Sequence, residues 1–205
     1  MPTLEIESLY KGRVGGVDEV GRGPWAGPVV AAVVVFLESP PLSLFSDIED
    51  SKKLSKAKRE LIYGELLKWG ALHYGIGMAS VEEIDRLNIS KATFLAMKRA
   101  VELLPQTPHT LLIDGKYIPS FEGIQTRPVI GGDGISLSIA AASILAKVTR
   151  DQMMEKLALE HPQYGWERNA GYGTAEHQNA LKSLGVTPHH RKSFAPVRTL
   201  LNPLS

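Results

Sequence analysis

The sequence predicts an α/β fold with one hydrophobic core. Five short runs rich in apolar and β-branched residues alternate with longer stretches in which apolar residues recur at helical spacing. Hydrophobic residues make up 43% of the 205 residues, which is enough for one core and a small appendage. The chain has no internal repeat and no linker long enough to separate two independent domains.

The strands are expected where apolar runs lie between glycine, proline and polar breaks. They cover residues 14–18, 28–36, 72–78, 110–114 and 127–130. Between the third and fourth runs, Ser80 and Glu83 have the spacing of a capping box, and Ser90 precedes a helical pattern that Pro105 ends. Two helices are therefore predicted there.

The longest helix is predicted from residue 136 to about residue 159. It opens with serines that can cap a helix, and the small side chains of Ala140, Ala141 and Ala142 allow close packing on a sheet. From about His161 the composition shifts to proline, glycine, histidine and aromatic residues. We therefore expect a main body over residues 1–160 and a small C-terminal segment, residues 161–205, packed beside it.

The composition excludes several classes of protein. Without cysteine, the chain has neither disulfides nor thiolate metal sites, which fits a reducing cytoplasm. The longest apolar run, residues 28–37, is too short to cross a bilayer, and the N-terminal residues lack the order of a signal peptide. Neither membrane insertion nor export is expected.

The net charge of +1 hides an uneven distribution. Acidic residues lead into a basic run after residue 50, and a second basic group, His189, His190, Arg191, Lys192 and Arg198, lies near the C-terminus. Two basic patches beside an acidic centre suit a polyanion held over metal ions. For Lys56 to Arg59, a solvated helix face is an equally good explanation.

The acidic centre begins with Asp18 and Glu19, which follow an apolar run and precede Gly21-Arg22-Gly23. Side chains alternate across a strand, so the two carboxylates can approach each other only if the strand ends there. Such a pair supplies the oxygen ligands that Mg²⁺ prefers, and the glycines let backbone N–H groups come close to a ligand. Since Arg22 can face phosphate, the run indicates metal-dependent attack on a phosphodiester.

Three more aspartates can join this pair. Asp114 ends a predicted strand, where α/β proteins commonly build sites. Asp133 lies in a glycine-rich loop ahead of the long helix, and Asp151 lies further along that helix. A turn or helix cap explains each aspartate by itself. Together with Asp18 and Glu19, the placement at strand ends favours a site of four carboxylates.

The sequence resembles the type 2 ribonucleases H, the bacterial ribonuclease HII family, over nearly its full length. The motifs that carry the resemblance occur in one order: GVDEVGRGPWAGPVV from Gly16, DSKKLS from Asp50, EIDRLNI from Glu83, LIDG from Leu112, SIAAASILAKVTRD from Ser138, HPQYGW from His161, GYGT from Gly171 and HHRKSF from His189. The resemblance implies a ribonuclease H-like fold, a five-stranded mixed sheet flanked by helices, with the small helical C-terminal segment beside the cleft.

The resemblance also implies the chemistry. It assigns catalysis and metal binding to Asp18, Glu19, Asp114 and Asp133, with two Mn²⁺ or Mg²⁺ ions that activate water and stabilise the leaving 3′ oxygen. The implied substrates are RNA/DNA hybrids and DNA duplexes with single embedded ribonucleotides, cut on the 5′ side of the ribonucleotide to leave 3′-hydroxyl and 5′-phosphate ends. A monomer that acts in ribonucleotide excision repair is expected.

The resemblance further implies how the substrate is recognised. Gly21, Arg22 and Gly23 are similar to the element that senses a ribose 2′-hydroxyl, and arginine rather than lysine at its centre favours ribonuclease HII over ribonuclease HIII. Tyr172 corresponds to a tyrosine that stacks on the next deoxyribose, although a single exposed tyrosine is usually only amphipathic surface. Further candidates for substrate contact are Lys52, Lys53, Ser143, Lys147, Arg150 and Arg191, and a solvated surface role stays open for each lysine.

For the paired His189 and His190, structural or phosphate-facing roles are favoured over metal binding, because Mg²⁺ prefers oxygen ligands and the carboxylates already suffice. Two positions depart from the family pattern, because Gly131 and Ala170 stand where lysine is usual. Two fewer positive charges predict weaker duplex binding and a flatter salt dependence, unless Arg168 compensates.

Two alternative functions stay open. One is a DNA-directed nuclease of the same fold, such as a junction resolvase or an integrase core, against which the Gly-Arg-Gly and GYGT elements speak. The other is a hybrid-binding protein that has lost or weakened its activity. The four carboxylates argue against it, because a binder has no use for them.

Overall fold

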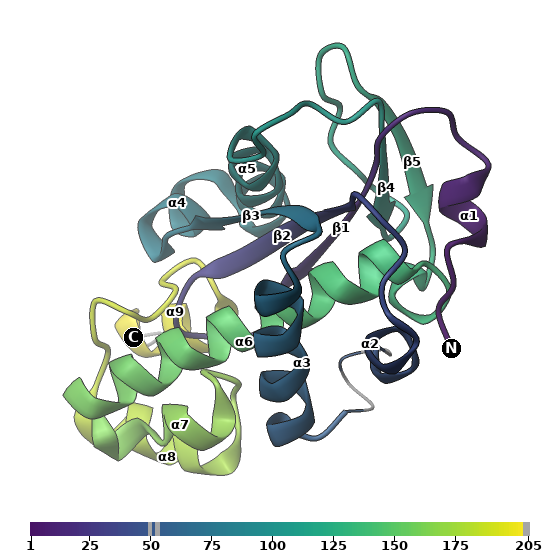
Figure 1. The fold of residues 1–205 in the computed structure, drawn as a ribbon. Coiled ribbons are helices and arrows are strands. Elements are labelled where there is room, and N and C mark those ends of the chain that lie inside the picture. The colour runs from purple at the N-terminus through teal and green to yellow at the C-terminus, as the bar shows by residue number, and fades with distance from the viewer. Residues whose placement is uncertain (49–50, 52–53, 203–205) are drawn as a thin grey trace.

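The computed structural model describes residues 1–48, 51 and 54–202. Within these residues, five strands form one mixed sheet in the order β3-β2-β1-β4-β5 (Figure 1). β1 is antiparallel to β2 and parallel to β4, while β2 is antiparallel to β3 and β4 is parallel to β5. The strands are β1 (Val14–Val20), β2 (Val29–Phe36), β3 (Leu72–Ala79), β4 (Thr110–Asp114) and β5 (Gln125–Val129). The predicted α/β fold is confirmed.

β1 ends later than the sequence predicts. Glu19 and Val20 continue the antiparallel ladder and pair with Ala31 and Val30 of β2. The prediction that the strand ends at Asp18 was therefore wrong, because the partner strand supplies hydrogen bonds for two more residues.

Helices cover both faces of the sheet (Figure 1). α6 (Leu137–Glu160) packs on β1 and β2 and also contacts α3 (Lys56–Trp69), while α5 (Ile89–Glu102) packs on β2 and β3 from the other face, next to α4 (Val81–Leu87). The remaining helical elements are α1 (Glu5–Ser8), α2 (Leu42–Asp47), η1 (Gly132–Gly134), η2 (Pro162–Tyr164), α7 (Trp166–Asn169), α8 (Ala175–Leu184) and α9 (Ala195–Leu201). No helix within the described residues combines the length and the apolar character needed to cross a membrane.

α6 lies very close to β1. A Cβ on Gly16 would lie 2.2 Å from the backbone nitrogen of Ile139, so only glycine fits at this point of the strand. Ala140, Ala141 and Ala142 are fully buried, as the close packing predicted for them requires. This short separation brings the side chains of α6 up to the carboxylates of β1.

Helix starts follow the capping rules, with one correction. Ser80 and Glu83 form the predicted capping box at α4, and Ser136 caps α6 by accepting a hydrogen bond from the N–H of Ile139 at 3.3 Å. The cap of α5 is Asn88 and not Ser90: its Oδ1 accepts from the N–H of Lys91 at 3.1 Å. Asn88 has φ of 70° and ψ of 162°, a conformation that is rare outside glycine, and the turn it makes lets α5 begin directly after α4 ends.

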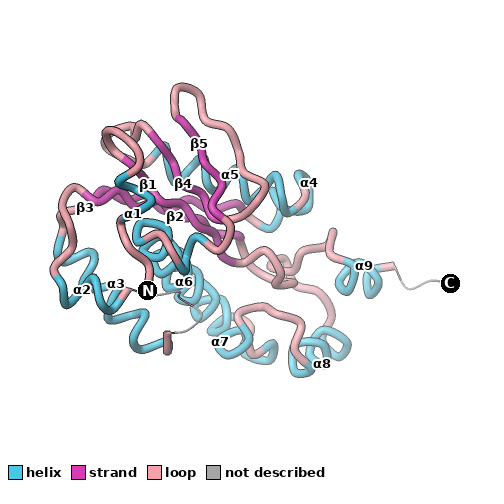
Figure 2. Tube along the Cα trace, turned by 90° about the vertical axis from the view of Figure 1, so that its right-hand side faces the viewer, coloured by secondary structure: helices cyan, strands magenta, loops and turns pink. Residues whose placement is uncertain are grey.

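The C-terminal helices α7 and α8 lie near the distal end of α6, away from the sheet, whereas α9 stands apart from α6 (Figure 2). Trp166 is fully buried there, in a cluster that includes Met154 and Ala158 of α6 and Leu181 of α8. The segment therefore shares α6 with the main body, and the division at residue 160 stays a prediction.

Candidate active site

Two of the predicted carboxylates lie on neighbouring parallel strands, next to the point where β4 ends. Val17 of β1 pairs with Ile113 of β4, so the next residue on each strand, Asp18 and Asp114, emerges at the same edge of the sheet. Asp18 is buried, with 5% of its surface exposed. Its burial first, and then the negative charges of Glu19 and Asp114, raise the pKa of Asp18 well above its usual value.

Hydrogen bonds partly offset this effect. The backbone N–H of Glu19 donates to Asp18 Oδ1 at 2.7 Å, and the side chain of Ser143 on α6 also bonds to Asp18. Both interactions favour the charged carboxylate and lower its pKa, but they are smaller than the effect of burial. Asp18 is thus a buried acid held beside two other carboxylates, as a cation site requires.

Glu19 reaches the site from the other face of the sheet. Because β1 continues to Val20, the side chain of Glu19 is directed away from α6, where it lines a cavity of about 310 Å³ together with Asp114 and residues of α5. Asp114 therefore belongs to both groups: it interacts electrostatically with Asp18 and shares the cavity with Glu19. The carboxylates therefore lie around the end of β4, and Glu19 joins them although β1 does not end before it.

Asp133 is placed by the loop that leads into α6. It is 6% exposed and lies in η1, and the N–H of the preceding Gly132 donates to Asp114 Oδ1 at 2.7 Å. The alternative that Asp133 caps α6 is contradicted, because Ser136 is the cap. The hydrogen bond from Gly132 ties this loop to the strand end that carries Asp114.

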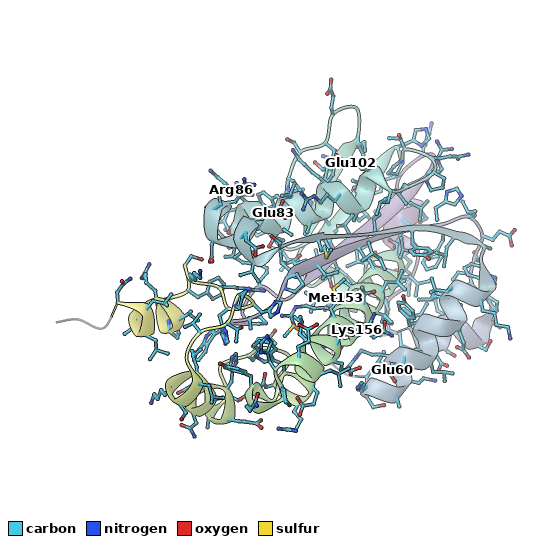
Figure 3. The ribbon with its side chains drawn as sticks, turned by 90° about the vertical axis from the view of Figure 1, so that its left-hand side faces the viewer. Glu60, Glu83, Arg86, Glu102, Met153 and Lys156 are labelled. Carbon is cyan, nitrogen blue, oxygen red and sulfur yellow. The ribbon has the colours of Figure 1, made fainter. Side chains whose placement is uncertain are left out.

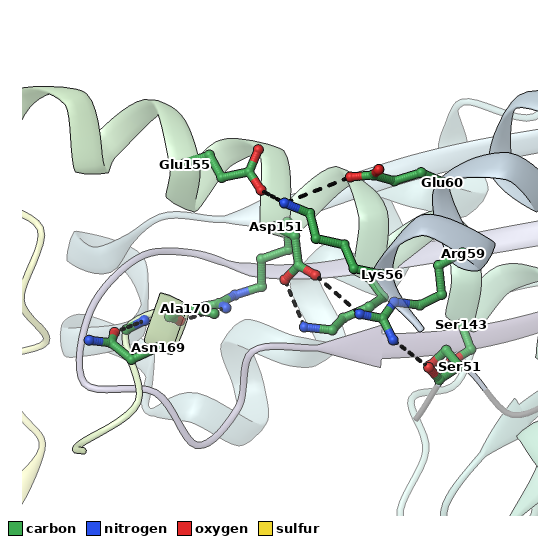
Figure 4. A network of polar contacts seen from close by, with 12 residues as sticks. Ser51, Lys56, Arg59, Glu60, Ser143, Asp151, Glu155, Asn169 and Ala170 are labelled. Atoms are coloured by element: carbon green, nitrogen blue, oxygen red, sulfur yellow. Dashed lines mark hydrogen bonds and ion pairs between the residues drawn. The ribbon is translucent and has the colours of Figure 1, made fainter. Parts of the chain in front are cut away.

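Ser143 connects the carboxylates to the DSKKLS motif. Its Oγ lies 2.8 Å from the Oγ of Ser51, which is itself buried (Figure 4). Lys52 and Lys53 of this motif were predicted to contact the substrate, and both lie outside the described residues. Ser51 was not predicted, and its place in the motif was the only signal for it in the sequence.

The structure brings the Gly-Arg-Gly element and Tyr172 together. A Cβ on Gly23 would lie 3.3 Å from Cε1 of Tyr172, and 46% of the tyrosine surface is exposed. Gly21 has φ of 93°, and a Cβ there would lie 2.2 Å from Nε of Arg150. Arg22 places Nη1 3.3 Å from Oε1 of Glu19, so the element is also connected to the carboxylates.

Arg150 and Arg191 do not have the predicted role in phosphate contact. Both are fully buried, and both donate only to backbone carbonyl oxygens within the described residues. Burial lowers the pKa of Arg150 to about 10, and burial together with the charge of Arg150 lowers that of Arg191 to about 9. A guanidinium enclosed in this way cannot reach a substrate.

These arginines instead hold the Gly-Arg-Gly element, the proposed recognition element, in place. Arg191 donates to the carbonyls of Gly21 at 2.6 Å and of Arg22 at 3.1 Å, while Arg150 donates to the carbonyl of Ala170 at 2.9 Å, two residues before Tyr172. They also share the carbonyl of Pro28. Together they join the loop after β1 to the C-terminal segment, so both are positioning residues.

Lys147 and Arg168 carry charges that neighbouring carboxylates partly neutralise. The Nζ of Lys147 lies 2.7 Å from Asp151 Oδ1, which assigns Asp151 to an ion pair outside the carboxylate site (Figure 4). Arg168 pairs with Glu167 and Glu176, so it does not supply a free charge in place of the two missing lysines. A contact from Lys147 to phosphate stays a prediction.

His190 has a structural environment. It is fully buried, with Nε2 3.0 Å from Nε2 of His177, which in turn accepts from the indole N–H of Trp166 at 3.2 Å. Burial and the neighbouring His177 lower the pKa of His190 to about 3, so the ring is neutral in ordinary buffers. His189, by contrast, is half-buried and faces a different group of residues.

The four carboxylates fit divalent cations in their chemistry. They offer only oxygen ligands, which Mg²⁺ and Mn²⁺ prefer over nitrogen or sulfur. Burial first, and then the negative charges of Glu19 and Asp114, raise the pKa of Asp18, so its charged form is unfavourable here, and a bound cation would stabilise it.

Comparison with known proteins identifies the family of the chain. The model of the ribonuclease HII family matches residues 15–197. Ribonuclease HII of Gluconobacter oxydans is 55% identical over 201 residues, which cover 98% of this chain and 97% of that protein. The crystal structure of ribonuclease H2 from Pyrococcus horikoshii OT3 has a TM-score of 0.76 at 26% identity, over 93% of this chain and 98% of the other. Bst-RNase HIII in complex with Mn²⁺ shares the fold, with a TM-score of 0.72 at 18% identity over 96% of this chain and 71% of the other. The chain therefore belongs to the ribonuclease HII family and is a type 2 ribonuclease H endonuclease.

Proposed function

We propose that this endonuclease nicks DNA duplexes on the 5′ side of single embedded ribonucleotides and also cuts the RNA strand of RNA/DNA hybrids, leaving 3′-hydroxyl and 5′-phosphate ends. The contact between Gly23 and the ring of Tyr172 carries the proposal. A protein distinguishes RNA from DNA at one residue by the ribose 2′-hydroxyl. An element that senses this hydroxyl and a ring that stacks on the next deoxyribose must be adjacent if they are to recognise one junction.

The backbone of the recognition element is rigidly held for this task. The guanidinium of Arg191 engages the carbonyls of Gly21 and Arg22, which sets the orientation of the intervening peptide planes. The exposed part of Tyr172 leaves its ring accessible to a sugar, while its backbone is fixed by the N–H bond to the carbonyl of Asn169 at 2.9 Å. The 2′-hydroxyl can then be selected by fixed backbone groups with little rearrangement.

Asp18, Glu19, Asp114 and Asp133 would hold two Mn²⁺ or Mg²⁺ ions, which supply activation of the attacking water and stabilisation of the leaving 3′ oxygen. The chain itself orients the ligand oxygens. The N–H groups of Glu19 and Gly132 fix Asp18 Oδ1 and Asp114 Oδ1, each at 2.7 Å. Ser143 holds Asp18 from the side of α6.

The proposal extends to the setting in which the enzyme works. A nick beside a ribonucleotide begins its excision from DNA, so we place the activity in ribonucleotide excision repair. A cytoplasmic location belongs to the same proposal, and the absence of cysteine supports it, while the monomeric state rests on the family resemblance alone.

The test is cleavage of an end-labelled DNA duplex with one embedded ribonucleotide, in Mg²⁺, in Mn²⁺ and in chelator. We expect a metal-dependent nick 5′ of the ribonucleotide and no cut in an all-DNA duplex. Cutting of the all-DNA duplex would favour a resolvase-like nuclease. Cutting of long hybrids without a nick at the single ribonucleotide would contradict the assignment of Gly21–23 and Tyr172.

Two variants refine the result. Tyr172→Ala should lose more activity on the single-ribonucleotide duplex than on a long hybrid, and Tyr172→Phe, which keeps the ring, should retain most of it. Asp114→Asn should lose cleavage of both substrates while it still binds duplex, because it removes a ligand of the proposed ions. Cleavage by Asp114→Asn at the wild-type rate would refute its assigned role.

A further inference from the structure

A second group of metal-ligating side chains lies at the opposite end of α6. Glu160 is the last residue of this helix, His161 is its C-terminal cap, and His189 comes from the loop between α8 and α9. Their ligand atoms all lie within 4.8 Å of one another. Glu160 is seventeen residues beyond Ser143 on the same helix, which is roughly 25 Å from the catalytic carboxylates.

The two imidazole rings have the separation that one shared ion requires. Their centroids are 5.4 Å apart and their planes make an angle of 63°. With metal–nitrogen bonds of about 2.0 Å and tetrahedral angles, two imidazoles on one Zn²⁺ ion have centroids roughly 5 Å apart. Oε2 of Glu160 is 4.0 Å from Nε2 of His189, and this exposed side chain can rotate to close the remaining gap.

The surroundings favour a cation at this point. Within the described part of the chain, no hydrogen bond engages the ring nitrogens of His161 or His189, and the ring of Trp166 supports both, at centroid distances of 5.5 and 6.0 Å. The C-terminal end of α6 contributes the negative end of its dipole. Glu82 of α4 also interacts electrostatically with His189.

The site is open to solvent on one side. His189 and Glu82 line a cavity of about 380 Å³ together with Met153 and Lys156 of α6. Figure 3 shows this side of the molecule, with Met153 and Lys156 on α6 below α4. A ligand set of two histidines and one carboxylate leaves a coordination position for water, and this cavity can admit it.

We propose that Glu160, His161 and His189 bind one Zn²⁺ ion, with water as the fourth ligand. Imidazole with carboxylate suits Zn²⁺, whereas Mg²⁺ prefers oxygen alone, so the two ends of α6 select different metals. The ion fastens the loop of His189 to the end of α6. The carbonyl of His189 accepts from the N–H of Gly27 at 2.9 Å, and Arg191 follows two residues later, so this connection steadies the support of the recognition element.

The test is calorimetric titration of Zn²⁺ into protein saturated with Mg²⁺, which occupies the catalytic carboxylates. We expect one equivalent to bind the wild type, and we expect Glu160→Gln, His161→Phe and His189→Gln each to weaken binding by more than about tenfold, since even indirect changes around a metal site cost that much. His109→Gln, which changes an exposed histidine elsewhere, should bind as the wild type does.

A second measurement identifies the ligands. Co²⁺ absorbs visible light strongly in a four-coordinate site with nitrogen ligands and weakly in a six-coordinate oxygen site. The strong band should appear in the wild type and in His109→Gln and be lost in His161→Phe and His189→Gln. Because Glu160 is exposed, Glu160→Gln can lose affinity without loss of fold, which a thermal melt without Zn²⁺ verifies. Equal Zn²⁺ affinity in all variants would overturn the proposal. So would a titration in which the only Zn²⁺ bound is the Zn²⁺ that replaces Mg²⁺ at the carboxylates.

Discussion

Replacement of Arg191 by methionine tests whether a buried guanidinium maintains the loop after β1. The change keeps most of the volume of the side chain and removes every donor. Four backbone carbonyls lose a hydrogen bond, those of Gly21, Arg22, Gly27 and Pro28. Pro28 still receives one from Arg150, so three carbonyls lose the side-chain donor that serves them.

The magnitude follows from these three carbonyls. An unsatisfied buried polar group costs about 1–3 kcal/mol, which gives a gross loss of roughly 3–9 kcal/mol. Removal of a buried charge offsets part of this loss of stability, since the lowered pKa of Arg191 shows that its charge is unfavourable to bury. We expect Arg191→Met to lower the free energy of unfolding by about 3–5 kcal/mol, in the range of other broken buried ionic contacts. Arg191→Lys, which keeps the charge but has three donors on one nitrogen, should lose about half as much.

The assay is urea unfolding at pH 7, with Arg168→Met as the matched control. Arg168 is 62% exposed and pairs only with surface carboxylates within the described residues, so Arg168→Met should unfold at nearly the same urea concentration as the wild type. In cleavage assays, Arg191→Lys should lower kcat more than it raises KM, and should retain more activity than Arg191→Met. A stability of Arg191→Met within 1 kcal/mol of wild type would refute the reasoning that these bonds hold the loop.

Three further predictions concern charge. In chelator at pH 7, Asp18→Asn should unfold at a higher urea concentration than wild type, because it removes a buried acid with a raised pKa. The difference in free energy of unfolding between the two proteins should shrink as the pH falls and Asp18 becomes protonated. Cleavage by the variant should be undetectable. Glu83, the capping-box residue of α4, is not one of the four carboxylates of the candidate active site. Hydrogen bonds from Arg99 and then Ser80 lower its pKa to about 2. Its stabilisation should be present above about pH 4.5 and be lost toward pH 2, so Glu83→Gln should cost about 1 kcal/mol at pH 7 and little at pH 2; a constant difference between the two proteins would contradict this. Ala170→Lys should bind duplex more tightly, and the slope of log K against log salt concentration should become steeper by about 0.9 for one added phosphate contact. An unchanged slope in a binding titration would show that residue 170 does not lie beside the bound substrate.

The sequence by itself determined the periodic elements and selected the candidate carboxylates of the site. Apolar runs and caps such as Ser80 and Ser136 are local signals, because side-chain alternation and capping act over a few residues, and the structure reproduces them. The placement of Asp114 at a strand end was predictable in the same way, from the apolar run that precedes it. Residues 15–197 also carry enough of the family pattern to identify the protein class.

Only the tertiary structure decided which partner each charged group has. Arg150, Arg191 and Lys147 are equally suited to phosphate in the sequence, yet the fold encloses the two arginines among carbonyls and gives the lysine to Asp151. The end of β1 was decided by pairing with β2, and the approach of His189 to Glu160 by the return of the C-terminal segment to α6. Burial and pairing depend on residues distant along the chain, and a local pattern contains no information about which of them come into contact.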